Sequence, residues 1–179
     1  VGALYAIGYD ARTMDSLVRK QNWMFLLSDK VYRYNLPFSE KEETEKYLVS
    51  VPIKNNREIK IPSGFISGQN IYNLFSDLTI GYHDSLDFKK LPIPFACVAS
   101  NLVDGKEVVQ DRGVLPLAMR ASMAIPGAFA PVRKNGMVLV DGGISNNFPV
   151  DIAKAMGADI IIGVDVQAEL KDASGLESV

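Results

Sequence analysis

The chain has 179 residues, of which 47% are hydrophobic, and its 19 basic and 21 acidic residues give a formal net charge of −2. This composition suits one globular domain with a sizeable core rather than a disordered segment. It offers no basic surplus for a nucleic-acid partner, and no apolar run approaches the roughly 20 residues that a membrane-spanning helix needs.

The sequence contains one cysteine, Cys97, and one histidine, His83. A disulfide within the chain and a cysteine-based metal site are therefore excluded, and so are most histidine-containing triads. Cys97 lies in an apolar run and is expected to be a buried, inert thiol. His83 lies among turn residues and is expected to be a solvated loop side chain. We expect no metal and no organic cofactor.

In the first third of the chain, residues 1–8 are apolar and end in glycine, which is typical of a buried helix with a glycine stop. Asp10 is positioned to cap a second helix over residues 11–21. Residues 23–27, "WMFLL", are five large apolar side chains beside polar neighbours. They predict either a mobile lid or interfacial patch, in contact with a membrane surface, or a buried segment.

The next stretch, residues 28–66, is the least regular part of the sequence and resembles an insertion. Ser39 and Glu42 form a capping-box pattern, and residues 47–62 predict an edge hairpin. A helix is expected over residues 67–78, with Ser67 as its cap.

The second half gives clearer signals. Residues 93–100 are a near-continuous apolar run, typical of a strand buried on both faces, and the chain then turns back through Asp104-Gly105. A helix is expected over 114–124, and residues 130–141 predict a hairpin with a type I′ turn at Asn135-Gly136.

A helix over 149–156 and a strand over 158–166 follow that hairpin. Together with the preceding strand they predict a βαβ unit with parallel pairing and a right-handed crossover. The fold class is therefore α/β, with a mostly parallel central sheet and helices on both faces, and residues 1–179 form one domain.

Asp141 ends the second strand of the hairpin, and Gly142 and Gly143 follow it. Loops at the carboxyl ends of strands in open α/β sheets gather catalytic groups, so Asp141 could act as a general base. The two glycines permit a tight turn and the close approach of a substrate. Alternatively, Asp141 only caps this turn. Asn146 and Asn147 are interpreted as turn and cap residues rather than ligands.

The combination of "RASMAIPGAFAPV" at 120–132, "DGGISNNFPVDIAKAMGADIIIGVDV" at 141–166, "VGALYAIGY" at 1–9 and "IPSGFISGQN" at 61–70 resembles the patatin-like phospholipases. The resemblance covers most of the chain, densely at 91–166 and thinly at 20–60. It implies a three-layer fold of the bacterial type and a lipid acyl hydrolase with a Ser–Asp dyad and no histidine. Asp141 then corresponds to the base of the dyad, and Gly142, Gly143, Ser122 and Pro126 would line the site.

The family nucleophile is the serine of a G-x-S-x-G elbow, a sharp turn from strand to helix. Because residues 1–9 resemble the helix that follows the elbow, we expect the elbow, its strand and the Gly-rich oxyanion loop to lie upstream of Val1. Residues 143–147 and 64–68 depart from the motif, and Ser122 has no base adjacent in sequence. This chain is therefore expected to carry the Asp half of the site.

Two other function classes stay open. One is a non-catalytic fragment of the same fold that binds lipid or a partner. The other is a nucleotide-binding α/β domain, although neither G-x-G-x-x-G nor a Walker-type loop is present. The expected partner is a lipid or other ester substrate. A chain without its elbow strand is expected to self-associate. The resemblance leaves the cytoplasm and the cell envelope as compartments.

Overall fold

The computed structural model describes residues 1–31, 37 and 64–166. The predicted capping box at Ser39 and the predicted hairpin over 47–62 lie outside the described residues. The chain divides into two compact units, residues 1–146 and 147–179. The prediction that residues 1–179 form one domain stays a prediction.

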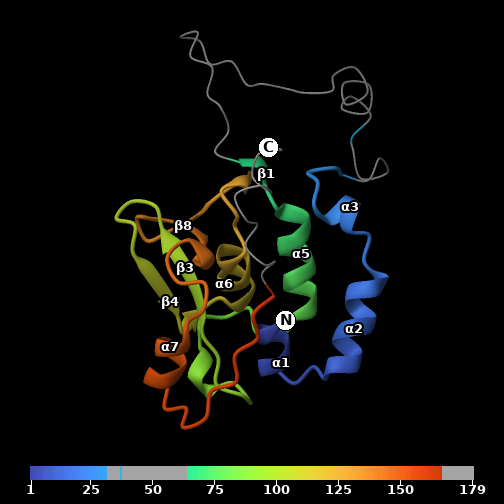
Figure 1. The fold of residues 1–179 in the computed structure, drawn as a ribbon. Coiled ribbons are helices and arrows are strands. Elements are labelled where there is room, and N and C mark those ends of the chain that lie inside the picture. Colours follow the sequence, from blue (N-terminus) through green and yellow to red (C-terminus); the bar gives the residue numbers. More distant parts are fainter. Residues whose placement is uncertain (32–36, 38–63, 167–179) are drawn as a thin grey trace, which may run out of the picture. The chain divides into compact units, whose positions relative to one another are not determined.

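Figure 1 shows the helices and strands along the chain. The helices are α1 (Gly2–Ala6), α2 (Ala11–Lys20), α3 (Trp23–Leu26), α5 (Gln69–Leu78), α6 (Leu115–Ser122) and α7 (Val150–Ala155), with short 3₁₀ helices η2 (Phe88–Lys90) and η3 (Gly142–Ile144). The strands are β1 (Gly64–Ile66), β2 (Leu86–Asp87), β3 (Cys97–Asn101), β4 (Glu107–Gln110), β5 (Arg112–Gly113), β6 (Gly127–Phe129), β7 (Val132–Lys134) and β8 (Met137–Asp141). Within the described ranges, no helix has both the length and the apolar character that crossing a bilayer requires.

Local signals for the helix ends are mostly correct. The carboxylate of Asp10 accepts hydrogen bonds of 2.9 Å from the backbone N–H groups of Arg12 and Thr13, as an N-cap does. The cap of α5 differs from the prediction, because Gly68 and not Ser67 is the N-cap residue, with φ at +75°. The hydroxyl of Ser67 still accepts a 3.3 Å hydrogen bond from the N–H of Gln69.

The main sheet of the first unit has the strand order β4-β3-β8-β7, and every neighbouring pair in it is antiparallel. The predicted parallel central sheet is therefore wrong for the described residues. Tight turns at Asp104-Gly105 and Asn135-Gly136 join β3 to β4 and β7 to β8, and a tight turn between consecutive strands imposes antiparallel pairing. Asn135 and Gly136 have φ values of 51° and 77°, as a type I′ turn requires.

The predicted βαβ unit fails at its last strand. Helix α7 forms as expected, and Gly157 follows it with φ at +95°. Residues 158–166, however, form no strand in the described structure, although they are strongly apolar. Among the described residues, the one parallel pair is β1 with β6.

The core of the first unit lies around α6, which packs against α5, β3 and β8. Figure 1 shows α6 between the sheet and α5. One buried cluster consists of Ala3, Ala6, Phe88, Leu91, Leu115, Ala118 and Met119, and a second consists of Ala99, Ala121 and Leu139. These contacts hold the carboxyl-terminal end of α6 against β8. The prediction that helices cover both sheet faces stays a prediction.

Candidate functional site

Asp141 is the last residue of β8, as the sequence predicts. Its backbone lies opposite Ala99 of β3, and its N–H donates a 3.0 Å hydrogen bond to the carbonyl of Ala124, just after α6. The side chain is half-buried. The position of Asp141 is therefore fixed from two sides, by the neighbouring strand and by the segment after α6.

One oxygen of the Asp141 carboxylate accepts a 2.8 Å hydrogen bond from the N–H of Gly143. Asp141 thus caps η3, which is the simpler of the two roles that its sequence context allows. The two roles are compatible, because a carboxylate has about four lone-pair sites and this bond occupies one of them. The capping bond also restricts the side-chain rotamer, and a base that must reach one particular proton benefits from that restriction.

Gly142 is buried against β3. A Cβ atom at this position would lie 2.7 Å from the carbonyl carbon of Val98, and still closer to the carbonyl oxygen. The backbone of β3 therefore leaves no room for a side chain here. This close approach explains the first glycine after Asp141 without any reference to a substrate.

The turn after Asp141 is held by side chains of β3 and β4. The hydroxyls of Ser100 on β3 and Ser145 share a 2.6 Å hydrogen bond, and the N–H of Ser145 donates to Ser100 Oγ at 3.2 Å. Farther along, the side-chain amide of Asn146 donates a 2.8 Å hydrogen bond to Glu107 of β4. Sequence analysis missed Ser100 and Glu107, because their partners lie about 40 residues away in the chain. A serine that ends a buried apolar run was the only signal for Ser100.

A pocket of about 290 Å³ lies beside α6. It is lined by Val1, Gly2, Ala3, Phe75, Phe95, Cys97, Met119, Ser122 and Met123. Most of this lining is apolar, and Ser122 contributes a hydroxyl. The volume is just below the range of about 300–1,000 Å³ that ligand pockets occupy.

The pocket and Asp141 belong to one neighbourhood. Ser122 and Met123 line the pocket, and Ala124, the next residue, accepts the hydrogen bond from the N–H of Asp141. The start of α1, at Val1 and Gly2, lines the same pocket. Pro126 is exposed in the loop before β6 and is not among the residues that line this pocket.

The remaining polar candidates have structural explanations. The ring of His83 is exposed, and its Nε2 lies 2.8 Å from the carbonyl oxygen of Ser76. Burial raises the pKa of the Cys97 thiol to about 12, partly offset by Lys134, so the thiol is neutral at physiological pH.

A second pocket, of about 400 Å³, lies between α3 and α5. Asn70 in its wall donates hydrogen bonds of 2.8 and 2.9 Å to the carbonyls of Ser28 and Lys30.

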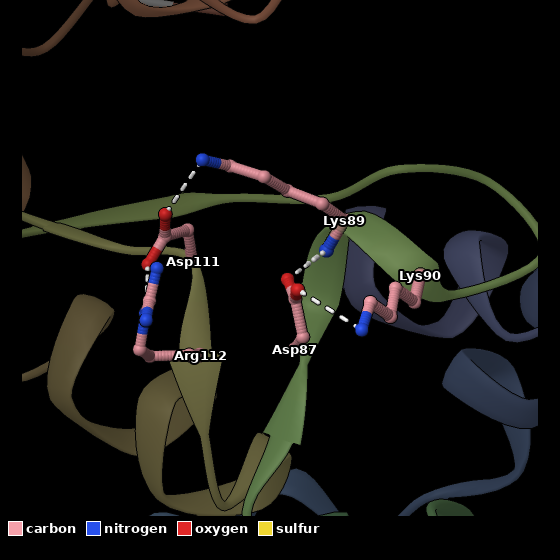
Figure 2. Close-up of polar contacts among 5 residues, drawn as sticks. All are labelled: Asp87, Lys89, Lys90, Asp111 and Arg112. Atoms are coloured by element: carbon pink, nitrogen blue, oxygen red, sulfur yellow. Dashed lines mark hydrogen bonds and ion pairs between the residues drawn. The ribbon is translucent and has the colours of Figure 1, made fainter.

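Asp111, a carboxylate whose pKa is strongly lowered, also has a structural explanation. Figure 2 shows Asp111 between Lys89, at 2.9 Å, and Arg112, at 3.1 Å. Hydrogen bonds from Arg112 and Lys89 lower the pKa of Asp111 to about 2. This group links η2 to the β2–β5 pair, and it includes none of the residues that line the pocket beside α6. Across the described part of the chain, no cluster of three or more His, Cys, Asp or Glu residues could hold a metal ion.

Comparison with known proteins gives a family. The family model described as patatin-like phospholipase matches residues 1–154. An uncharacterized NTE family protein of Mycobacterium tuberculosis is 36% identical over 104 residues, which are 58% of this chain and 28% of that protein. Patatin-like phospholipase domain-containing protein 7 of Rattus norvegicus is 33% identical over 106 residues, which are 58% of this chain and 7% of that protein. The matched stretch is therefore only a minor part of these relatives.

Proposed function

Because the chain belongs to the patatin-like phospholipase family, we propose that it is the part of a serine-dependent lipid acyl hydrolase that carries the general base, Asp141. The substrate class is a phospholipid or another carboxylic ester. The observation that carries the proposal is the link between the pocket beside α6 and the tip of β8. Val1, Ser122 and Met123 line that pocket, and the carbonyl of Ala124 binds the N–H of Asp141.

In this proposal the nucleophilic serine precedes Val1 in a longer protein. A serine there would enter the neighbourhood of the pocket from the start of α1. Ser122 also lines the pocket, and it is the second choice. Ser145 is a weaker choice, since its hydroxyl is already bonded to Ser100 at 2.6 Å.

The reaction would then run in two steps. The serine oxygen attacks the ester carbonyl carbon while Asp141 takes the hydroxyl proton, and that proton passes to the departing alcohol. Water next attacks the acyl-serine carbonyl carbon while Asp141 takes a proton from it. The bond to the serine oxygen then breaks, the carboxylic acid leaves, and the proton passes from Asp141 to the serine oxygen. Backbone N–H groups outside this chain would stabilise the oxyanion in both steps.

The test uses a longer protein that includes the residues upstream of Val1. Asp141→Asn is the informative variant, because the amide oxygen of Asn can still accept the hydrogen bond from Gly143 but Asn cannot take a proton. We expect turnover of a short-chain nitrophenyl ester to fall about 10²–10⁴-fold without loss of folding. His83→Ala is the matched control and should stay within a few-fold of wild type. Near wild-type turnover by Asp141→Asn would remove Asp141 as the base.

A serine-directed fluorophosphonate locates the nucleophile. Labelling needs a hydroxyl that is activated by a base and faces oxyanion donors. We expect the longer protein to label upstream of Val1 and the 179-residue chain alone to stay unlabelled. Stoichiometric labelling of the short chain at Ser122 or Ser145 would place the nucleophile inside it.

A non-catalytic role is the second candidate, and one observation favours it. The carboxylate of Asp141 already caps η3 through Gly143, so the aspartate has a structural use without any reaction. In that case the longer protein would bind lipid, and neither it nor Asp141→Asn would turn over an ester or label.

A further inference from the structure

Four apolar side chains are exposed where α2 meets α3. They are Val18, Trp23, Met24 and Leu27, with exposed fractions of 46%, 40%, 86% and 41%. We call this set the α2–α3 patch. Trp23 and Leu27 are one helical turn apart, and the indole nitrogen of Trp23 donates a 2.9 Å hydrogen bond to the carbonyl of Val18. The hydrogen bond of Trp23 to Val18 joins the last turn of α2 to the first residue of α3, and the four exposed side chains lie within this short stretch of the chain.

The patch is built on an anchored segment. Leu26 of α3, which lies roughly opposite Met24 on the helix, is buried, and α3 packs against α5. The side chain of Asn70 on α5 holds the carbonyls of Ser28 and Lys30, and Asp29 accepts hydrogen bonds of 2.7 Å from the N–H and 2.6 Å from the hydroxyl of Ser67. Figure 1 shows α2 and α3 beside α5. These bonds favour a fixed outward-facing patch over the mobile lid that residues 23–27 also suggested.

The internal hydrogen bond of Trp23 matters for a lipid partner. An indole N–H that enters an apolar medium without a partner costs free energy. Here the carbonyl of Val18 already supplies the partner, so the ring can leave water without losing a hydrogen bond. Tryptophan is also common at membrane–water interfaces.

The charges around the patch complement an anionic surface. Lys20 ends α2 and Lys30 follows α3, and both are exposed. Two carboxylates lie in the same segment, Asp15 paired with Arg19 at 2.9 Å and Asp29 hydrogen-bonded to Ser67. The three cations of residues 15–30, Arg19, Lys20 and Lys30, exceed these two carboxylates by one positive charge. Cations beside an exposed apolar surface are the combination that binds anionic lipid headgroups.

We propose that the α2–α3 patch docks the protein onto an anionic phospholipid surface, with Trp23 and Met24 in the interface and Lys20 and Lys30 among the headgroups. This inference is independent of the dyad, because it involves none of the residues that line the pocket beside α6. It holds for an active hydrolase and for a non-catalytic lipid-binding protein alike.

Trp23 is the only tryptophan of the chain, so its fluorescence reports directly on the patch. Titration with vesicles of equimolar phosphatidylglycerol and phosphatidylcholine should shift its emission to shorter wavelength, and added salt should weaken the effect. Vesicles of phosphatidylcholine alone should give a smaller shift. An unchanged spectrum with the anionic vesicles would overturn the proposal.

Two variants distinguish binding through the α2–α3 patch from non-specific binding to vesicles. Met24→Asp should weaken binding to the anionic vesicles about tenfold or more in co-sedimentation, because it removes apolar contact and adds a repelled charge. Ile80→Asp is the matched control, since Ile80 is 77% exposed outside the patch and the charge change is the same. Equal losses in the two variants, or a Trp23 shift that requires a protein partner instead of vesicles, would refute the membrane assignment.

Discussion

The guanidinium of Arg120 occupies the space above the α-carbon of Gly68, so that a Cβ atom at residue 68 would lie 2.7 Å from Cζ of Arg120 and closer to two of its nitrogens. Arg120 is buried in α6, and its Nη2 donates hydrogen bonds of 2.8 Å to the carbonyl of Ser67 and 2.9 Å to that of Ala130. The same guanidinium lies over the ring of Phe129, 4.9 Å from its centroid. Arg120 thus joins the start of α5 to the region after β6.

Gly68→Ala should destabilise the protein through two effects. The left-handed backbone at φ +75° costs about 1–2 kcal/mol for a residue with a Cβ atom, and the new methyl group meets Arg120. Gly81→Ala is the control, because Gly81 also has a positive φ, +92°, but no atom lies within 4 Å of its Cβ position. We expect a fall in melting temperature of about 2–8 °C for Gly81→Ala and a larger fall for Gly68→Ala. Equal falls in melting temperature for the two variants would mean that the Arg120 side chain moves aside at no cost in stability.

The hydrogen-bonded pair of Ser100 and Ser145 should be energetically coupled. Ser100→Ala also removes the acceptor for the N–H of Ser145, whereas Ser145→Ala leaves that bond in place. Each loss should cost about 1 kcal/mol, with Ser100→Ala the larger. Denaturant unfolding of both single variants and the double variant tests this. Strict additivity of the two single changes would contradict the coupling.

The ion pairs of Asp111 should support the fold at neutral pH and fail in acid. The pKa of Asp111 is lowered from 3.8 to about 2, so its stabilising charge is fully present above about pH 4 and lost as the pH falls through about 2. Because the Lys89 and Arg112 side chains are 53% and 75% exposed, screening keeps the effect small. Asp111→Asn should lower the melting temperature by about 2–4 °C at pH 7, and the difference from wild type should shrink between pH 4 and 2.

Asp84→Asn serves as its control, because it removes the same charge from an exposed turn residue. A pH-independent difference between Asp111→Asn and wild type would mean that lost packing, rather than the ion pairs, is responsible.

The half-buried thiol of Cys97 should make the fold sensitive to alkali. Its pKa rises from 9.0 to about 12 in the folded chain, so above about pH 9 the unfolded chain releases a proton that the folded chain retains. Stability must then fall between about pH 9 and 12. Cys97→Ala should remove that component, which appears as a smaller loss of unfolding free energy from pH 8 to pH 10 than in wild type. Parallel pH profiles for the two proteins would contradict the raised pKa.

Much of the local structure could be predicted from the sequence. The Asn135-Gly136 turn, the Asp10 cap and the strand that ends on Asp141 each depend on a few adjacent residues. The direction of strand pairing could not be predicted in this way. The apolar run at 158–166 resembled a buried strand, but a strand also needs a partner, and partners are not visible in a local pattern.

The candidate site likewise has a part that could be predicted from adjacent residues and a part that could not. Asp141 and its two glycines were visible as a strand tip followed by a flexible turn. The contacts of that turn with Ser100 and Glu107 were not, because they join strands that are distant in sequence. Gly142 is an example: a glycine is required there because the backbone of Val98 leaves no room for a side chain, and not because of the turn that the neighbouring residues suggested.

The raised pKa of Cys97 has a practical consequence for spectroscopy. A thiol with a pKa of about 12 is almost entirely protonated at pH 7, and only the thiolate attacks maleimide and methanethiosulfonate reagents. Because the sequence holds no other cysteine, a single cysteine introduced at Met24 would be the dominant reactive thiol in the native protein. A nitroxide or fluorophore attached there could report its depth in a bilayer, with Cys97 left in place as part of the pocket wall.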